Sequence, residues 1–171
     1  MIIKTKNLVL RDYKKEDIGH LVKNINDKNV SRYMCYVSYP YSQKEGIKWI
    51  KRCLALQRKK KKKEVNFVIE KSGCFIGSIG LKKIKGHKAE MGYWIGKKHW
   101  GRGIATEAVK MIADFGFKKL KLKRIYAYVF EKNKSSCRVL EKNGFIKEGF
   151  LRKDRMKDGK FVNVYLYAKV K

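Results

Sequence analysis

Residues 89–130 read AEMGYWIGKKHWGRGIATEAVKMIADFGFKKLKLKRIYAYVF, and they decide the fold. Residues 89–95 are predicted to form a strand, residues 104–118 an amphipathic helix and residues 122–130 a second strand. The apolar positions of the helix fall on one face: Ile104, Ala108, Met111, Ile112 and Phe115. A strand, a helix and a strand in this order require two parallel strands in one sheet. The helix N-terminus then lies near the carboxyl end of the first strand, where α/β sheets usually bind anionic ligands.

The loop between this strand and this helix, KKHWGRGIAT at residues 97–106, contains the candidate binding site. Gly101 and Gly103 remove side chains where a backbone must approach a ligand closely. Successive N–H groups and the positive end of the helix would form a concave anion site. The loop matches neither the G-x-x-x-x-G-K-[ST] nor the G-x-G-x-x-G phosphate-binding pattern. Taken alone, the G-x-G turn also fits an ordinary strand–helix connection.

The remaining chain is predicted to add strands and helices around this unit. A Ser42 to Glu45 spacing indicates a capping box at the start of a helix. Asn143-Gly144 indicates a helix stop, and Lys157-Asp158-Gly159 indicates a turn. Further strands are expected over residues 2–13, 65–70, 74–84, 145–151 and 160–168, and further helices over residues 12–25, after Ser42, and over 134–142. No repeat or linker-like stretch interrupts the chain, so we expect one domain over residues 1–171.

Composition narrows the class of protein. The chain has 171 residues, 44% hydrophobic and 12% aromatic, which is typical of a packed domain. No apolar run reaches the roughly 20 residues of a membrane span, and residues 1–17 lack the features of a secretory signal. We therefore expect a cytoplasmic protein. Its four cysteines form no C-x-x-C pair and its three histidines do not cluster with them, so neither a metal nor a disulfide framework is expected.

The formal charge of +29 attracts polyanions such as nucleic acid, ribosomes or phosphate-bearing cofactors. Only nine of the 44 basic residues are arginine, and the lysines are scattered, so a general lysine bias explains the charge as well as a nucleic-acid surface does. The run from Arg58 to Lys63, RKKKKK, fits either a nucleic-acid patch or the solvated end of a helix. We favour the helix end, with weak non-specific affinity for nucleic acid.

Four segments together resemble the GNAT superfamily of acetyltransferases, and within it the ribosomal-protein N-acetyltransferases of the RimJ/RimL type. They are MGYWI at 91–95, WGRGIATEA at 100–108, Asn133-x-x-Ser136, and LEKxGF at 140–145. The opening KTKNLVLRDYKKED at 4–17 is also similar to the first strand and helix of that branch. The resemblance implies an α/β fold with a mixed sheet of about seven strands. Its two parallel central strands would splay apart around acetyl-CoA, with helices on both faces.

The resemblance also implies roles for particular residues. The pyrophosphate would be held by N–H groups of the loop and helix start, and Trp94 and Ile95 would pair, strand-fashion, with the amides of the pantetheine arm. Asn133 would bind the cofactor, cap its helix, or do both. The cofactor-binding residues implied are Trp94, Ile95, Trp100, Gly101, Arg102, Gly103, Ile104, Ala105, Thr106 and Asn133.

The chain departs from the family pattern at Leu140, where many members carry a tyrosine that protonates the departing thiolate. Ser136 is the candidate replacement, although it also fits a helix-turn hydroxyl bonded to the backbone. A backbone N–H on the strand 91–95 would polarise the thioester carbonyl. Glu90 is the candidate proton acceptor for the amine; it also fits an outward-facing strand carboxylate.

The expected reaction is direct acetyl transfer to a primary amine. An α-amino group with a pKa of about 7.7 is roughly one-sixth neutral at pH 7, whereas a lysine near 10.4 is neutral only a few times in ten thousand. A site without an obvious strong base therefore suits α-amines. We expect the acceptor to be a protein or peptide N-terminus in a ribosome-associated setting. The protein itself is expected to be a monomer or a homodimer. The alternatives are a small-molecule amine such as a polyamine or antibiotic, and an RNA-binding or CoA-sensing module without turnover.

Overall fold

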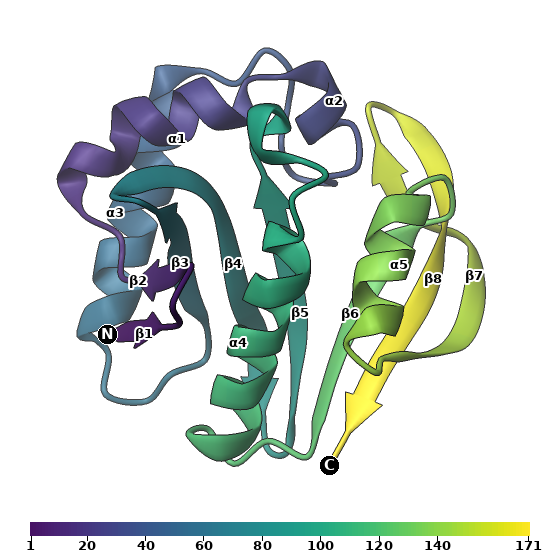
Figure 1. Cartoon of the computed structure of the whole chain (residues 1–171). Coiled ribbons are helices and arrows are strands. Elements are labelled where there is room, and N and C mark those ends of the chain that lie inside the picture. The colour runs from purple at the N-terminus through teal and green to yellow at the C-terminus, as the bar shows by residue number, and fades with distance from the viewer.

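The computed structural model describes residues 1–171 and builds them around a sheet of eight strands (Figure 1). The order across the sheet is β1-β2-β3-β4-β5-β6-β8-β7, and only β5 and β6 are parallel neighbours. The strands are β1 (Ile2–Lys4), β2 (Val9–Arg11), β3 (Val65–Lys71), β4 (Cys74–Lys85), β5 (Lys88–Ile95), β6 (Arg124–Phe130), β7 (Ile146–Lys157) and β8 (Lys160–Val170). The parallel pair predicted from residues 89–130 is therefore confirmed.

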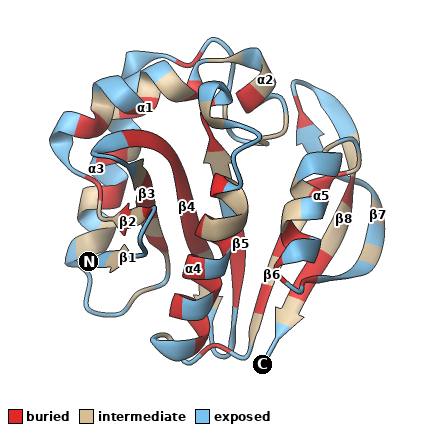
Figure 2. Ribbon diagram, in the orientation of Figure 1, coloured by how far each residue is buried: buried red, intermediate tan, exposed pale blue.

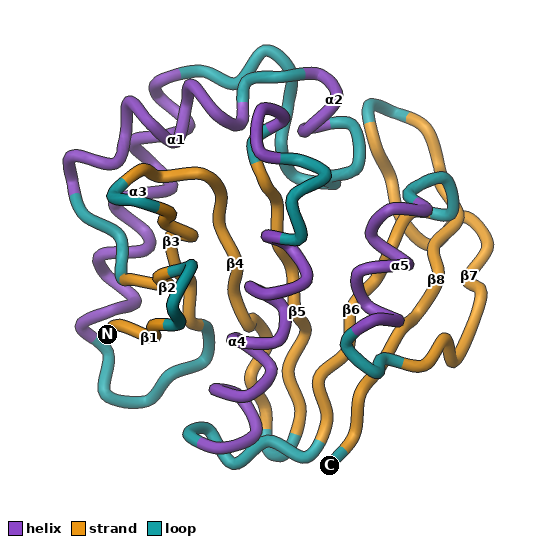
Figure 3. Tube along the Cα trace, viewed as in Figure 1, coloured by secondary structure: helices purple, strands orange, loops and turns teal.

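Helices cover both faces of the sheet, as Figure 3 shows. They are α1 (Ile18–Ile25), α2 (Lys28–Ser31), α3 (Gln43–Arg58), α4 (Ile104–Lys118) and α5 (Lys134–Lys142), with 3-10 turns η1 (Lys15–Asp17) and η2 (Lys97–His99). The helices α4 and α5 pack on one face, and α1 and α3 pack on the other. None of the helices combines the length and apolar character needed to cross a membrane.

Local signals set the helix boundaries. The Ser42 hydroxyl accepts the N–H of Glu45 at 3.2 Å, and the Glu45 carboxylate accepts the N–H of Ser42 at 2.7 Å, so the predicted capping box is confirmed. The helix α4 spans the predicted residues 104–118. Its apolar face lies in the main core between α4 and the sheet, where the red segments of Figure 2 mark buried residues. A Cβ at Gly116 would come within 2.8 Å of Ile125 Cδ1, so this glycine allows α4 to approach the sheet closely.

The mixed α/β sheet expected from the sequence is confirmed, with eight strands where about seven were expected, and the single strand predicted over residues 2–13 is corrected. The side-chain oxygen of Thr5 accepts hydrogen bonds from the N–H groups of Asn7 and Leu8, at 3.3 and 3.1 Å. The main-chain N–H of Thr5 donates to Leu8 O. This turn divides the segment into β1 and β2, which pair antiparallel. The strand β7 also extends to Lys157, beyond the predicted end at 151, because register shifts let it continue along β8. The short helix α2 was not predicted.

Candidate active site

The two parallel strands separate shortly after they pair. Residues 88–90 of β5 lie opposite residues 124–126 of β6, and beyond Glu90 and Tyr126 the strands no longer pair. Figure 1 shows β5 and β6 diverging above this point, with the start of α4 beside the end of β5. The main-chain groups along this edge of β5 are consequently left without a strand partner.

The edge of β5 that faces the splay carries the main-chain groups of Tyr93 and Ile95. The Gly96 N–H donates to Ile76 O of β4 at 2.9 Å, and Trp94 O lies against Gly77 of β4. Because the main-chain groups of alternate residues in a strand point to opposite sides, those of Trp94 and Gly96 face β4, and those of Tyr93 and Ile95 face away. The main-chain groups of Trp94 are therefore not available for the expected pairing with the pantetheine arm, and Trp94 lines the splay with its side chain.

The turn into α4 forms a cradle of unpartnered donors. Gly101 and Gly103 have φ angles of +74° and +71°, a left-handed conformation that strains other residues. A Cβ added to either glycine would have no neighbour within 4 Å, so the space beside them is open. No side chain caps the N-terminus of α4. Its first N–H groups and the positive end of the helix are therefore available to an anion.

A cleft of about 400 Å³ runs along this splay and is lined by 22 residues. All ten residues that sequence analysis assigns to cofactor binding line this cleft, together with Ser136. Its charged residues are Arg32, Arg102, Arg138 and Lys142, and no aspartate or glutamate lines it. A cleft with a helix N-terminus, four cations and no anion is suited to a ligand that carries several phosphates.

Trp100 attaches the glycine-containing loop to the end of β5. Its indole Nε1–H donates to Ile95 O at 2.7 Å, although the residue is 44% exposed. Because this bond occupies the carbonyl of Ile95, its N–H is the main-chain group of Ile95 left to face the cleft. The neighbouring His99 is partly buried near Arg102, and burial followed by that positive charge lowers the pKa of its imidazole. His99 is therefore neutral at physiological pH.

Asn133 and Ser136 occupy the first turn of α5 across the splay. The Asn133 side-chain oxygen accepts the N–H of Ser136 at 3.2 Å, so Asn133 is the helix N-cap. Its amide nitrogen has no partner within the chain. The hydroxyl of Ser136 is bonded to the hydroxyl of Tyr93, at 2.7 Å, and to no main-chain carbonyl. Leu140 is fully buried in the core, so it contributes no polar group to the cleft.

Glu90 does not line the cleft. It lies at the base of the splay, and its neighbours Ala89 and Met91 belong to the core under α4, so its side chain is on the opposite face of the sheet. The side chain is 8% exposed and forms ion pairs with Lys82 at 3.0 Å and Lys83 at 2.9 Å. Burial alone would raise the pKa of Glu90, but the two ammonium groups outweigh it and lower the pKa. The alternative of an outward-facing carboxylate is wrong.

Several lining residues were missed in the sequence. Tyr93 lies inside the recognised strand but was given no role, because nothing in the sequence placed Ser136 beside it. Arg138 and Lys142 are four residues apart on α5, so they share a face, and this spacing was the available signal. Arg32 follows α2, whose N-cap Asp27 accepts the N–H of Asn29 at 2.7 Å. An aspartate N-cap at Asp27 is the signal in the sequence that indicates this short helix.

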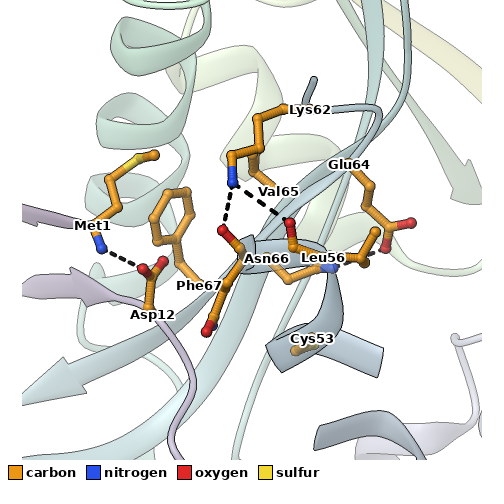
Figure 4. A pocket seen from close by; sticks show the side chains of 10 residues that line it. Met1, Asp12, Cys53, Leu56, Lys62, Glu64, Val65, Asn66 and Phe67 are labelled. Carbon is orange, nitrogen blue, oxygen red and sulfur yellow. Dashed lines mark hydrogen bonds and ion pairs between the residues drawn. The ribbon is translucent and has the colours of Figure 1, made fainter. Parts of the chain in front are cut away.

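A second cavity, of about 210 Å³, lies at the C-terminal end of α3 beside β3 (Figure 4). None of the predicted site residues lines it. Lys62, from the basic run 58–63, donates there to the main-chain oxygen of Gln57 at 2.7 Å, and Figure 4 shows its ammonium group near Leu56. The favoured interpretation of this run, cations at the negative end of a helix, is therefore confirmed for Lys62.

Comparison with known proteins identifies relatives of one kind. A family model described as acetyltransferase (GNAT) domain matches residues 7–146. The uncharacterized N-acetyltransferase p20 of Bacillus licheniformis is 32% identical over 170 residues, which is 98% of this chain and 94% of that protein. The ribosomal-protein-serine acetyltransferase of Escherichia coli (strain K12) is 31% identical over 106 residues, 61% of this chain and 59% of that protein.

Solved structures agree with this. A GNAT-family acetyltransferase from Bacillus anthracis has a TM-score of 0.87 at 26% identity, covering 99% of this chain and 98% of that chain. The spermidine N-acetyltransferase of Vibrio cholerae, solved with CoA and spermine, has a TM-score of 0.82 at 25% identity, covering 97% and 96%. RimL, a ribosomal L7/L12 alpha-N-protein acetyltransferase in complex with coenzyme A, shares the fold with a TM-score of 0.90 at 19% identity, covering 99% and 98%.

Proposed function

The chain belongs to the GNAT acetyltransferases, and from this premise we propose that it transfers the acetyl group of acetyl-CoA to the α-amino group of a protein or peptide. Acetyl-CoA supplies an activated acyl group as a thioester. The residues of the chain bind and orient that donor, and they set the charge around the amine. The observation that carries the proposal is the convergence of all ten predicted cofactor residues on one cationic cleft.

We assign the cofactor contacts from the geometry of the cleft. The main-chain N–H groups of the α4 cradle would hold the two linked phosphates, with Arg102 at the rim. The free main-chain groups of Tyr93 and the free N–H of Ile95 would pair with the amides of the pantetheine arm, beside Trp94 and Trp100. The free side-chain nitrogen of Asn133 would donate to the cofactor from the opposite wall. The N–H groups of the cradle come from Gly101, Gly103, Ile104, Ala105 and Thr106.

The charge at the base of the splay supports an α-amine acceptor. Glu90 is the buried carboxylate at this point, and Lys82 and Lys83 already neutralise it. Two ammonium groups beside one carboxylate disfavour the binding of a polycation there, and they lower the pKa of a bound amine. An α-amino group needs only a small shift to become neutral at pH 7. The formal charge of +29 also favours acceptors surrounded by ribosomal phosphate.

The relatives support two acceptor classes. One is named a ribosomal-protein-serine acetyltransferase, and another is a spermidine acetyltransferase. We favour the protein N-terminus because a spermidine site needs carboxylates that are free to pair with the polyamine's ammonium groups, and Glu90 is occupied.

Purified protein with acetyl-CoA is expected to acetylate short peptides that begin with Ser, Thr or Ala, measured as free thiol release and located by mass spectrometry. The same peptides blocked at the α-amine, with an internal lysine left free, are the matched control and should react at least 100-fold more slowly, because lysine is rarely neutral at pH 7. Thiol release with spermidine or an amine antibiotic, and with no peptide, would replace the protein acceptor by a small molecule. Binding of acetyl-CoA without any turnover would indicate a sensor.

The low pKa of Glu90 predicts that it is a poor proton acceptor. The kcat/KM of the unmodified protein should rise with pH to a plateau, with a midpoint near the amine's value of about 7.7. Because the folded-state pKa is lowered, the ion pairs of Glu90 are complete above the unfolded value of about 4.3 and are lost only as pH falls through the folded value. They do not titrate in this range. Glu90→Gln should lower kcat/KM by less than about tenfold and leave the midpoint unchanged. A loss of more than 100-fold with a displaced midpoint would restore Glu90 as the general base.

A further inference from the structure

The hydroxyl groups of Tyr93 and Ser136 form the one side-chain hydrogen bond between β5 and α5, with 2.7 Å between their oxygens. Both residues line the cofactor cleft, from opposite sides of the splay. Along β5, Tyr93 lies between Ile95, next to the phosphate cradle, and Glu90, at the base of the splay. A donor arm that runs along this edge toward the base therefore passes the pair.

Tyr93 is the one group of the chain that bonds to the hydroxyl of Ser136. Its N–H is already accepted by Asn133, and its Oγ makes no bond to a carbonyl of the preceding turn. Tyr93 is partly buried, and burial raises the pKa of its hydroxyl to about 12, although the bond to Ser136 opposes this. The phenol is thus protonated throughout the neutral range and can donate to Ser136 Oγ. The proton of Ser136 then remains free to point into the cleft.

The leaving group requires a hydrogen-bond donor more than it requires an acid. The thiol formed has a pKa of about 8.5 if it behaves like cysteine, so its thiolate is a weak base. A proton on Tyr93, whose pKa is about 12, would move to that thiolate against a gap of about 3.5 pKa units. Transfer of the proton to the sulfur is therefore unfavourable. A hydrogen bond to the sulfur, by contrast, stabilises the negative charge that develops there. Leu140 offers no such group.

We propose that Tyr93 is a positioning residue: its hydroxyl orients that of Ser136 toward the departing sulfur, so that Ser136 donates a hydrogen bond there without giving up its proton. The proposal rests on the acetyl-CoA site proposed above. As the neutral amine nitrogen forms its bond to the acetyl carbon, the carbon–sulfur bond breaks and the sulfur keeps the electron pair. The nitrogen releases one proton to water as it becomes the amide. Ser136 and Tyr93 retain their protons, and the sulfur takes a proton from water afterwards.

The test measures the pKa of the CoA thiol in the protein–CoA complex, from the ultraviolet absorbance of the thiolate as pH is raised. The bound thiol should be more acidic than that of free CoA. Ser136→Ala should reduce its ionisation constant by about tenfold or more, as expected for one hydrogen bond to a charged group. Tyr93→Phe should produce part of this reduction, although it keeps the ring and touches no part of the sulfur.

Tyr33→Phe is the matched control. Tyr33 also lines the cleft, but its hydroxyl donates to Lys132 O at 3.2 Å, away from Ser136. This variant should leave the thiol pKa unchanged. Affinity for CoA below pH 7, where the thiol is neutral, should change by less than about threefold in Tyr93→Phe, and its thermal unfolding should remain cooperative.

Three results would overturn the proposal. One is a thiol pKa in Tyr93→Phe equal to that of the unmodified protein, which would mean that Ser136 acts without Tyr93. Another is a bound thiol no more acidic than free CoA. The third is a pH–rate profile that falls again at high pH in place of the expected plateau, with a descending limb that moves in Tyr93→Phe, which would indicate that the pair transfers a proton. Because the titration uses CoA and no acceptor, it is independent of the acceptor class. Failure of the unmodified protein to bind CoA would instead refute the cofactor site itself.

Discussion

Gly103→Ala is expected to lower the affinity for acetyl-CoA by about 100-fold or more, because the change acts on both the shape and the donors of the cradle. Gly103 has a φ of +71°, so a side chain there strains the backbone that aims the first N–H groups of α4. The added Cβ would also stand in the open space at the cleft wall that we assign to the phosphates. Calorimetry with acetyl-CoA measures the effect.

Gly73→Ala separates the loss of the cradle from simple backbone strain. Gly73 has a φ of +76° in the turn between β3 and β4, and a Cβ there also meets nothing within 4 Å. Both alanine variants should lose about 1–2 kcal/mol of unfolding free energy, but only Gly103→Ala should lose affinity. If the two variants bound acetyl-CoA equally well, the phosphates would have to lie elsewhere.

Arg11→Met is expected to destabilise the fold by about 3–5 kcal/mol and to lower Tm by roughly 10 °C. Arg11 donates to both carboxylate oxygens of Asp17, at 2.8 Å each, and to Glu70 of β3 at 2.5 Å. Asp17 is only 4% exposed. Methionine fills much the same volume but leaves two adjacent carboxylates without their cation, one of them buried. Chemical denaturation and calorimetric melting measure the loss.

Arg124→Met is the matched control for this substitution. Arg124 also pairs with a carboxylate, Glu148, but that pair lies at the surface, with side chains 26% and 37% exposed. Solvent screens such pairs, so the cost should stay below about 1 kcal/mol. Equal losses in the two variants would show that the Arg11 network has no special weight in holding η1 and α1 against the sheet.

The parts of the site that follow one another in the chain could be predicted from the sequence. The cradle lies within residues 100–106, and its geometry depends on two glycines with positive φ and on the first turn of α4. These are local preferences of the backbone, so they are visible in the residues themselves. The crossover from β5 to β6 was equally predictable, because a strand–helix–strand unit allows only a parallel pair.

Contacts between distant segments could not be predicted in this way. Tyr93 and Ser136 are 43 positions apart, and their bond depends on how far β5 and β6 separate and where α5 packs. Glu90 is held by two lysines because β4 has an irregular register after Lys82, and Lys83 there has a φ of +52°. No alternating pattern predicts that both ammonium groups reach one buried carboxylate.

The amino-acid sequence by itself determined the order of the elements, the parallel pair of strands and the glycine-containing turn before α4. The spacing of apolar residues, helix caps and glycines act over only a few residues, so their effects are visible locally. Only the tertiary structure decided which hydroxyl bonds to that of Ser136 and what charge surrounds Glu90. Those features arise where separately folded segments meet. Their energies depend on distances and burial that are set by packing of the whole chain.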